Sequence, residues 1–153
     1  MKLLLAILAG MMVCFGIVPD CGGAVCKGQI GLASELPVIR KAAERNGIEF
    51  GSDDWFLLLA IRQAENGRSG CEFGVRHPKA WDTCLDTQAG WAAATIIKHH
   101  RRFDSGEVTT AFIYSLADRY CPASCDFEGN NNWKKNVRFW FVKFREINPG
   151  LLF

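Results

Sequence analysis

The segment LLLAIRQAENG, residues 57–67, constrains this chain most, because a run of apolar residues leads directly into a carboxylic acid. Leu58, Ile61 and Glu65 are spaced by three and four residues, so in a helix their side chains fall on one stripe. Asn66 and Gly67 follow, a pair that is typical of a helix end. The sequence therefore predicts a buried helix that ends on an acid, where burial would raise the pKa of the Glu65 carboxyl.

Periodicity alone leaves two interpretations of Glu65 open. The first is structural, with the carboxylate paired to Arg62, Arg68 or Arg102. The second is chemical, because a carboxyl with a raised pKa can act as a general acid near neutral pH.

Apolar periodicity and turn residues predict four further helices, at 35–46, 87–103, 109–119 and 133–147. Ser34 is the expected N-cap of the helix at 35–46, and Asp86 or Thr87 is the expected N-cap of the helix at 87–103. Residues 68–86 are rich in glycine and cysteine and predict an irregular loop, and Asn130, Asn131 and Asn132 predict a turn that caps the last helix. Apolar and polar residues rarely alternate in the way that is typical of β-strands. We therefore expect a mainly α domain of about five helices.

The N-terminus, MKLLLAILAGMMVCFGIVPDCGGA, has a basic residue followed by an apolar run and then small residues. This pattern predicts a secretory signal peptide at 1–24, cleaved after Ala24, followed by one domain at 25–153. An uncleaved membrane anchor is the alternative; after cleavage we expect no stable membrane insertion. The protein is thus expected to be exported, to the periplasm or the extracellular space. Its net charge of +2 is too small to indicate nucleic acid as a partner.

Seven cysteines are present, and export makes pairing of the thiols plausible. Two disulfides would each close a short loop: Cys71 with Cys84, and Cys121 with Cys125. Cleavage after Ala24 leaves an odd number of cysteines, so one thiol would be free. A zinc site is the alternative, but the chain has no CxxC pair and its histidines lack ligand spacing to the cysteines, so we expect no metal and no cofactor.

LLLAIRQAENGRSG, residues 57–70, resembles the opening motif of the SLT-type lytic transglycosylases and goose-type lysozymes. In that family an apolar helix of the form L-x-A-I-I-x-x-E-S ends on the sole catalytic glutamate. Glu65 falls on that acid, and Asn66 falls on the polar residue after it, usually a serine. The resemblance extends from Trp55 to about Val142.

TQAGWAAAT, residues 87–95, resembles the family segment G-A-x-G-L-x-Q, with Gly90 on the second glycine and Trp91 on the leucine. Thr87 and Gln88 depart from the family's Gly-Ala, and Ala93 stands where the family's glutamine helps to hold the glycan. In LADRYCP, Tyr120 corresponds to the family's tyrosine, although no asparagine follows it. The stretch RYCP…NNNWKKNV resembles the end of small phage-related and secreted bacterial members.

The resemblance implies a lysozyme-like, mainly helical fold with an irregular loop beside a cleft that binds peptidoglycan glycan strands. The implied activity is that of a lytic transglycosylase, a monomer that breaks the bond between N-acetylmuramic acid and N-acetylglucosamine with Glu65 as acid and base. The positions expected to bind substrate are Asn66, Trp81, Asp86, Gly90, Trp91 and Tyr120, and Arg119, Lys134 and Lys135 are candidates to meet peptide carboxylates.

Three alternatives remain. A hydrolytic lysozyme (muramidase) needs a second carboxylate, for which Asp82 and Asp86 are the candidates. A catalytically silent glycan-binding domain would retain the fold without the chemistry. A disulfide-stapled structural protein of the cell envelope would explain only the cysteines.

Overall fold

The computed structural model describes residues 32–146, so the predicted signal peptide and its cleavage site lie outside the described residues. Within this range the chain forms five helices and no strand, which confirms the prediction of a mainly helical fold. The helices are α1 Leu32–Arg45, α2 Asp53–Glu65, α3 Leu85–Phe103, α4 Thr110–Tyr120 and α5 Phe127–Glu146. Residues 66–84, between α2 and α3, are irregular, which is close to the loop predicted at 68–86.

Helix α2 forms the centre of the core. All seven side chains from Trp55 to Ile61 are buried, and α5 packs along α2 while α1 packs on α3. At its start the Ser52 hydroxyl accepts a hydrogen bond from the Trp55 amide, and at its end Asn66 adopts a left-handed conformation with φ 42°. Both ends match the prediction, which leaves Glu65 as the last residue of the helix.

Small side chains let α3 approach its neighbours closely. Ala89, Ala92 and Ala93 are fully buried, and α3 contacts α1, α2 and α4. Helix α3 begins at Leu85 with Cys84 as its N-cap, so Asp86 lies in the first turn and does not cap the helix.

Two other helices begin earlier than predicted. Helix α1 starts at Leu32, which places Ser34 inside it. Helix α5 starts at Phe127 and not at residue 133, because the Asp126 carboxylate accepts a hydrogen bond from the Gly129 amide at 2.8 Å and supplies a start signal. The predicted asparagine turn at 130–132 is therefore wrong. Asn130 is buried inside α5, where its amide group donates to Asp118 Oδ1 at 3.0 Å and to the Cys121 carbonyl at 2.6 Å.

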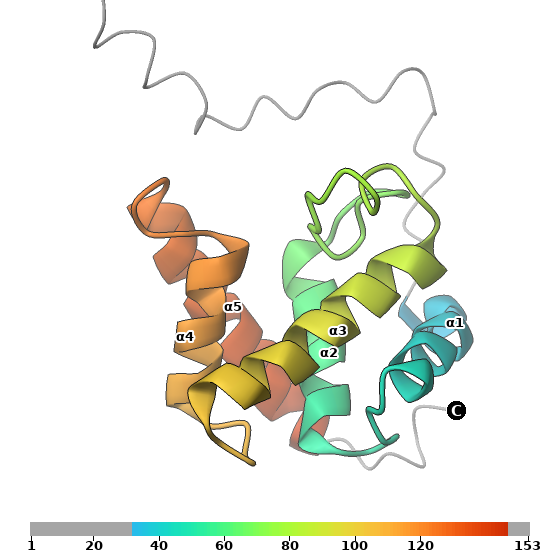
Figure 1. The fold of residues 1–153 in the computed structure, drawn as a ribbon, viewed down its shortest axis with the longest axis horizontal. Coiled ribbons are helices and arrows are strands. Elements are labelled where there is room, and N and C mark those ends of the chain that lie inside the picture. Colours follow the sequence, from blue (N-terminus) through green and yellow to red (C-terminus); the bar gives the residue numbers. More distant parts are fainter. Residues whose placement is uncertain (1–31, 147–153) are drawn as a thin grey trace, which may run out of the picture.

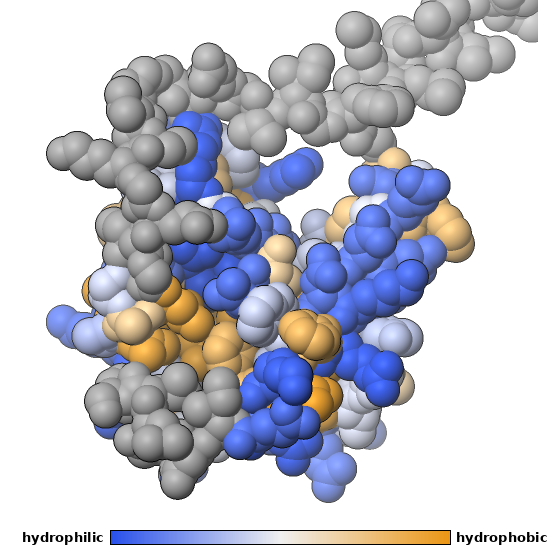
Figure 2. Space-filling view, turned by 180° about the vertical axis from the view of Figure 1, so that it is seen from behind, coloured by the Kyte–Doolittle hydropathy of each residue, from blue (hydrophilic) through white to orange (hydrophobic). Residues whose placement is uncertain are grey.

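The C-terminal end of α2 faces an edge where two parts of the molecule stand apart (Figure 1). On one side lies the loop 66–84, and on the other lie the end of α4, the start of α5 and the turn that joins them. Seen from behind, the surface is notched at this edge (Figure 2). Between residues 32 and 146, no helix is long and apolar enough to cross a membrane.

Candidate active site

Glu65 meets Trp133 at the end of α2. The indole Nε1–H of Trp133 donates a hydrogen bond to Glu65 Oε1 at 2.8 Å. Trp133 is itself buried and belongs to α5, which packs along α2 and so brings together two residues that are 68 positions apart in the chain. The acid is therefore held in a partly buried position by a neutral donor.

Burial is the main influence on the ionisation of Glu65. It raises the pKa of the Glu65 carboxyl, while the Trp133 hydrogen bond and the positive charge of Arg76 act in the opposite direction with smaller effect. The protonated form is thus favoured relative to that of an exposed glutamate, as a group that must donate a proton requires.

Tyr120 completes this cluster from α4. Its ring stacks on Trp133, with the ring centroids 5.1 Å apart and the planes inclined by 24°. The phenol oxygen is buried and has no hydrogen-bond partner among residues 32–146. Burial and the negative charge of Glu65 raise the pKa of Tyr120, so the phenol stays neutral. The structure therefore brings two of the predicted residues, Glu65 and Tyr120, together around an indole that the sequence analysis did not select.

Two glycines allow the loop 66–84 to fold closely over the acid. Gly74 has φ 62°, and a Cβ atom placed on it would overlap the Glu65 carboxyl group. A Cβ on Gly67 would overlap the backbone of Cys71. Any larger side chain at Gly74 would displace the carboxylate, so the backbone of this residue forms one wall of the site.

Gln88 anchors the same loop to α3. Its side chain is fully buried, and its amide nitrogen donates to the carbonyl oxygens of Gly70, at 3.0 Å, and of Ala80. Gly70 lies in the first half of the loop and Ala80 in the second half, so a single side chain holds both halves. In the sequence analysis, Gln88 is noted only because it differs from the family's Gly-Ala. In the structure its role is to hold the loop.

Two of the three arginines expected to pair with Glu65 lie elsewhere. Arg62 forms a two-contact ion pair with Glu35 of α1, at 2.7 Å for both nitrogen–oxygen distances. Arg102 lines a separate pocket between α3 and α4. The prediction of an ion pair with Arg62 is therefore wrong, and the cation that acts on Glu65 is Arg76.

The other predicted substrate-binding residues have contacts elsewhere. Asp86 pairs with Arg45 of α1, with 2.7 Å from Nη2 to each carboxylate oxygen. Trp91 stacks on the His77 ring at a centroid distance of 4.2 Å, and Gly90 lies beside Asn46. Asn66 is exposed at the end of α2, where its amide N–H donates to the Arg62 carbonyl at 3.1 Å.

Trp81 is half-buried in the loop 66–84, and Asp82 is exposed there with φ 56°.

The sequence analysis did not identify Trp133, Gly74 and Arg76 as residues of the site. Trp133 did lie within the quoted NNNWKKNV segment, and Gly74 follows the apolar Phe73 in a glycine-rich loop, but neither position carries a local signal for contact with Glu65.

Cys71, Cys84, Cys121 and Cys125 are free thiols in the structure, and their pairing stays a prediction. Across residues 32–146 no three His, Cys, Asp or Glu side chains are grouped as metal ligands would be.

No protein-family model, curated protein or solved structure matches this chain.

Proposed function

We propose that this protein is an exported lytic transglycosylase of lysozyme-like fold, which cleaves the glycan strands of peptidoglycan with Glu65 as acid and base. The observation that carries the proposal is the position of Glu65. The carboxyl ends an apolar helix, accepts a hydrogen bond from the Trp133 indole at 2.8 Å, and has a pKa raised by burial. A partly buried carboxyl whose pKa is raised is suited to donate a proton to a glycosidic oxygen.

The reaction needs one carboxyl. Glu65 gives its proton to the oxygen that joins N-acetylmuramic acid to N-acetylglucosamine, and the bond from that oxygen to the anomeric carbon breaks. The glucosamine unit leaves with a hydroxyl group. The Glu65 carboxylate then takes the proton of the muramoyl 6-hydroxyl while that oxygen bonds to the anomeric carbon. The product is a 1,6-anhydro ring, no water is consumed, and Glu65 is protonated again.

The surroundings of Glu65 favour the transglycosylase over the hydrolase. A hydrolytic enzyme uses a second carboxylate at a set distance from the first. Besides burial, the groups that act on the Glu65 pKa are Trp133 and Arg76, and neither is a carboxylate. Asp86, one of the two candidates, is engaged by Arg45.

Trp81 is the substrate contact that the geometry supports best. The Tyr120 phenol is neutral and lies within the electrostatic influence of Glu65, but its oxygen is buried, so it bears on the reaction through its contacts in the Glu65 cluster. Trp81 lies half-buried in the loop 66–84, where its ring could stack on a sugar face. Trp91 is less suited, because one of its faces is already covered by His77.

The test is digestion of bacterial sacculi by the purified protein, with the released muropeptides identified by mass spectrometry. We expect anhydro-muramoyl products from the wild type, a loss of at least about a hundredfold in Glu65→Gln, and little change in Glu107→Gln, an exposed control. Asp82→Asn and Asp86→Asn should remain active.

Other outcomes would identify the alternatives. Reducing-end products, lost in Asp82→Asn or Asp86→Asn, would indicate a hydrolase. Binding of sacculi without release of products by any protein would indicate a silent glycan-binding domain. Activity retained by a folded Glu65→Gln protein would contradict the proposed role of Glu65.

A further inference from the structure

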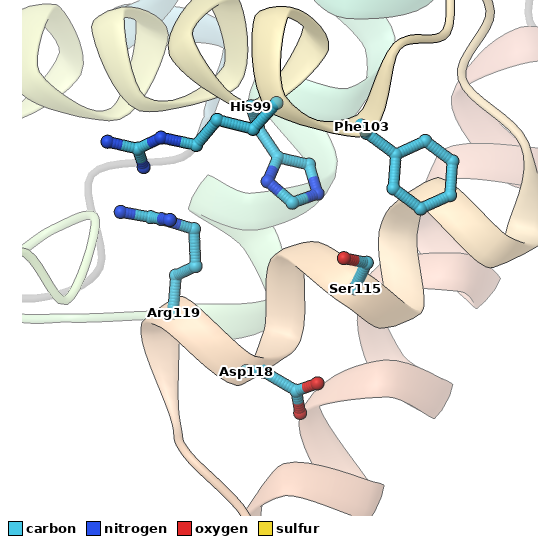
Figure 3. Close-up of a pocket in the computed structure, with 6 residues that line it drawn as sticks. His99, Phe103, Ser115, Asp118 and Arg119 are labelled. Carbon is cyan, nitrogen blue, oxygen red and sulfur yellow. The ribbon is translucent and has the colours of Figure 1, made fainter.

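A second site candidate is a pocket of about 370 Å³ between α3 and α4 (Figure 3). Its volume lies at the lower end of the range for small-molecule sites. None of its lining residues belongs to the Glu65 cluster: they are His99, Arg102, Phe103, Ser115, Asp118 and Arg119.

The pocket is positively charged. Arg102 and Arg119 are exposed at its rim, and neither forms an ion pair with any residue between 32 and 146. Asp118 also lines the pocket, but its carboxylate is engaged by α5, through Asn130 Nδ2 at 3.0 Å and Lys134 Nζ at 3.5 Å. Its side chain points away from Arg119 (Figure 3). Two guanidinium groups are thus left at the rim without a carboxylate of this part of the chain.

The wall of the pocket contains a buried histidine. His99 is only 4% exposed, and its ring packs against Phe103 and edge-on against Phe112, at 5.8 Å and 4.7 Å between centroids. Neither ring nitrogen has a hydrogen bond of standard geometry within the described part of the chain, and the Phe112 backbone is the only nearby group that favours the charged ring. Burial, followed by the charge of Arg119, lowers the pKa of His99, so the imidazole is neutral and offers one donor and one acceptor. Buried polar atoms are costly when unpaired, and a ligand seated here would bring polar atoms close to the ring.

We propose that this pocket binds a small organic oxyanion, with Arg102 and Arg119 on the anionic group and Phe103 against the apolar part of the ligand. A planar guanidinium pairs with a carboxylate or a phosphate in the same two-point geometry, so both are candidate anionic groups. The hydroxyl of Ser115, also in the lining, can add a donor. The proposal is independent of the function proposed for Glu65, because it uses none of the same residues.

The test is titration of the purified full chain at low ionic strength, followed by calorimetry, with three probes. Acetyl-Ala-Ala carries a free carboxylate, glycerol phosphate carries a phosphate, and acetyl-Ala-Ala amide carries neither. We expect saturable binding of at least one anionic probe and not of the amide, weakened about tenfold or more by Arg102→Gln and by Arg119→Gln. Arg101→Gln is the matched control, since Arg101 is an exposed cation on the same helix that does not line the pocket.

The preferred probe identifies the anionic group. Absence of saturable binding of both anions, or equal weakening by Arg101→Gln, would overturn the proposal. Circular dichroism on each variant shows whether the fold is retained. Glu65→Gln should bind the probes as the wild type does, so a failure of the glycan-cleavage proposal leaves this result unaffected.

Discussion

At the scale of single residues, Trp133 and Gly74 set the direction of the Glu65 carboxyl. The indole donates to Oε1 at 2.8 Å, and the Gly74 backbone lies against the other side of the carboxyl group. The two contacts come from different parts of the chain, a helix and a loop. Together they keep the carboxyl from turning, which a proton donor needs if it is to meet a particular glycosidic oxygen.

Trp133→Phe tests this positioning. The substitution removes the indole N–H and keeps an aromatic ring against Tyr120, so we expect kcat on sacculi to fall about tenfold to a hundredfold with a stability loss of about 1 kcal/mol. Because the indole hydrogen bond lowers the pKa of Glu65, its loss should also move the descending limb of the pH–rate profile to higher pH.

The control for this variant is Trp140→Phe, a half-buried tryptophan of the same helix without a contact to Glu65. Steady-state rates across pH and thermal unfolding provide the measurements. An unshifted profile together with an unchanged kcat would show that Trp133 only fills space.

At the scale of elements, the loop 66–84 depends on α3 for its shape. Gln88 is the link, through the carbonyls of Gly70 and Ala80. Gly74 lies within this loop and against Glu65. A change in the loop conformation is therefore expected to move the Glu65 carboxyl.

Gln88→Ala is expected to lower the free energy of unfolding by about 2–4 kcal/mol. It leaves the Gly70 carbonyl unpaired, leaves the Ala80 carbonyl with the Thr83 hydroxyl alone, and opens a cavity. Limited proteolysis should then cut within 66–84 faster than in the wild type. Gln63→Ala, a change of the same type on α2, serves as control and should cost under about 1 kcal/mol. Equal protease resistance of the two variants would show that the loop is held by other contacts.

Elements with local signals at both ends were predictable from the sequence. Helix α2 has a serine cap and an Asn-Gly end, and its bounds were close to those observed. The start of α5 was missed. Asp126 carries a local start signal, but Asn130 to Asn132 have poor helix propensity, and the contacts of Asn130 with Asp118 and Cys121 come from the fold. The contact between Glu65 and Trp133 could not be derived either, since periodicity reports on neighbours within a helix and not on a partner 68 positions away.

At the scale of the whole molecule, the buried acid couples stability to pH. The folded pKa of Glu65 is raised, so between its unfolded and folded values the folded chain binds more protons than the unfolded chain. The free energy of unfolding therefore falls as pH rises through this window, and above it the charged carboxylate destabilises the fold.

Glu65→Gln should consequently be more stable than the wild type at pH 7.5, by a few degrees in Tm, because the amide still accepts the Trp133 hydrogen bond without carrying a charge. The difference should shrink as pH falls toward 4. Glu72 is also buried with a raised pKa, but it is present in both proteins and cancels from the comparison. Scanning calorimetry at both pH values measures the effect, and a Tm difference that does not change with pH would contradict it.

The distance in sequence between Glu65 and Trp133 has a consequence for the newly made chain. Synthesis runs from the N-terminus, so the glutamate emerges long before the indole that belongs beside it. Until α5 docks on α2, Glu65 lacks its Trp133 hydrogen bond, and the pKa of its carboxyl is not yet that of the folded protein. The proposed acid is therefore complete only after the last described helix is in place.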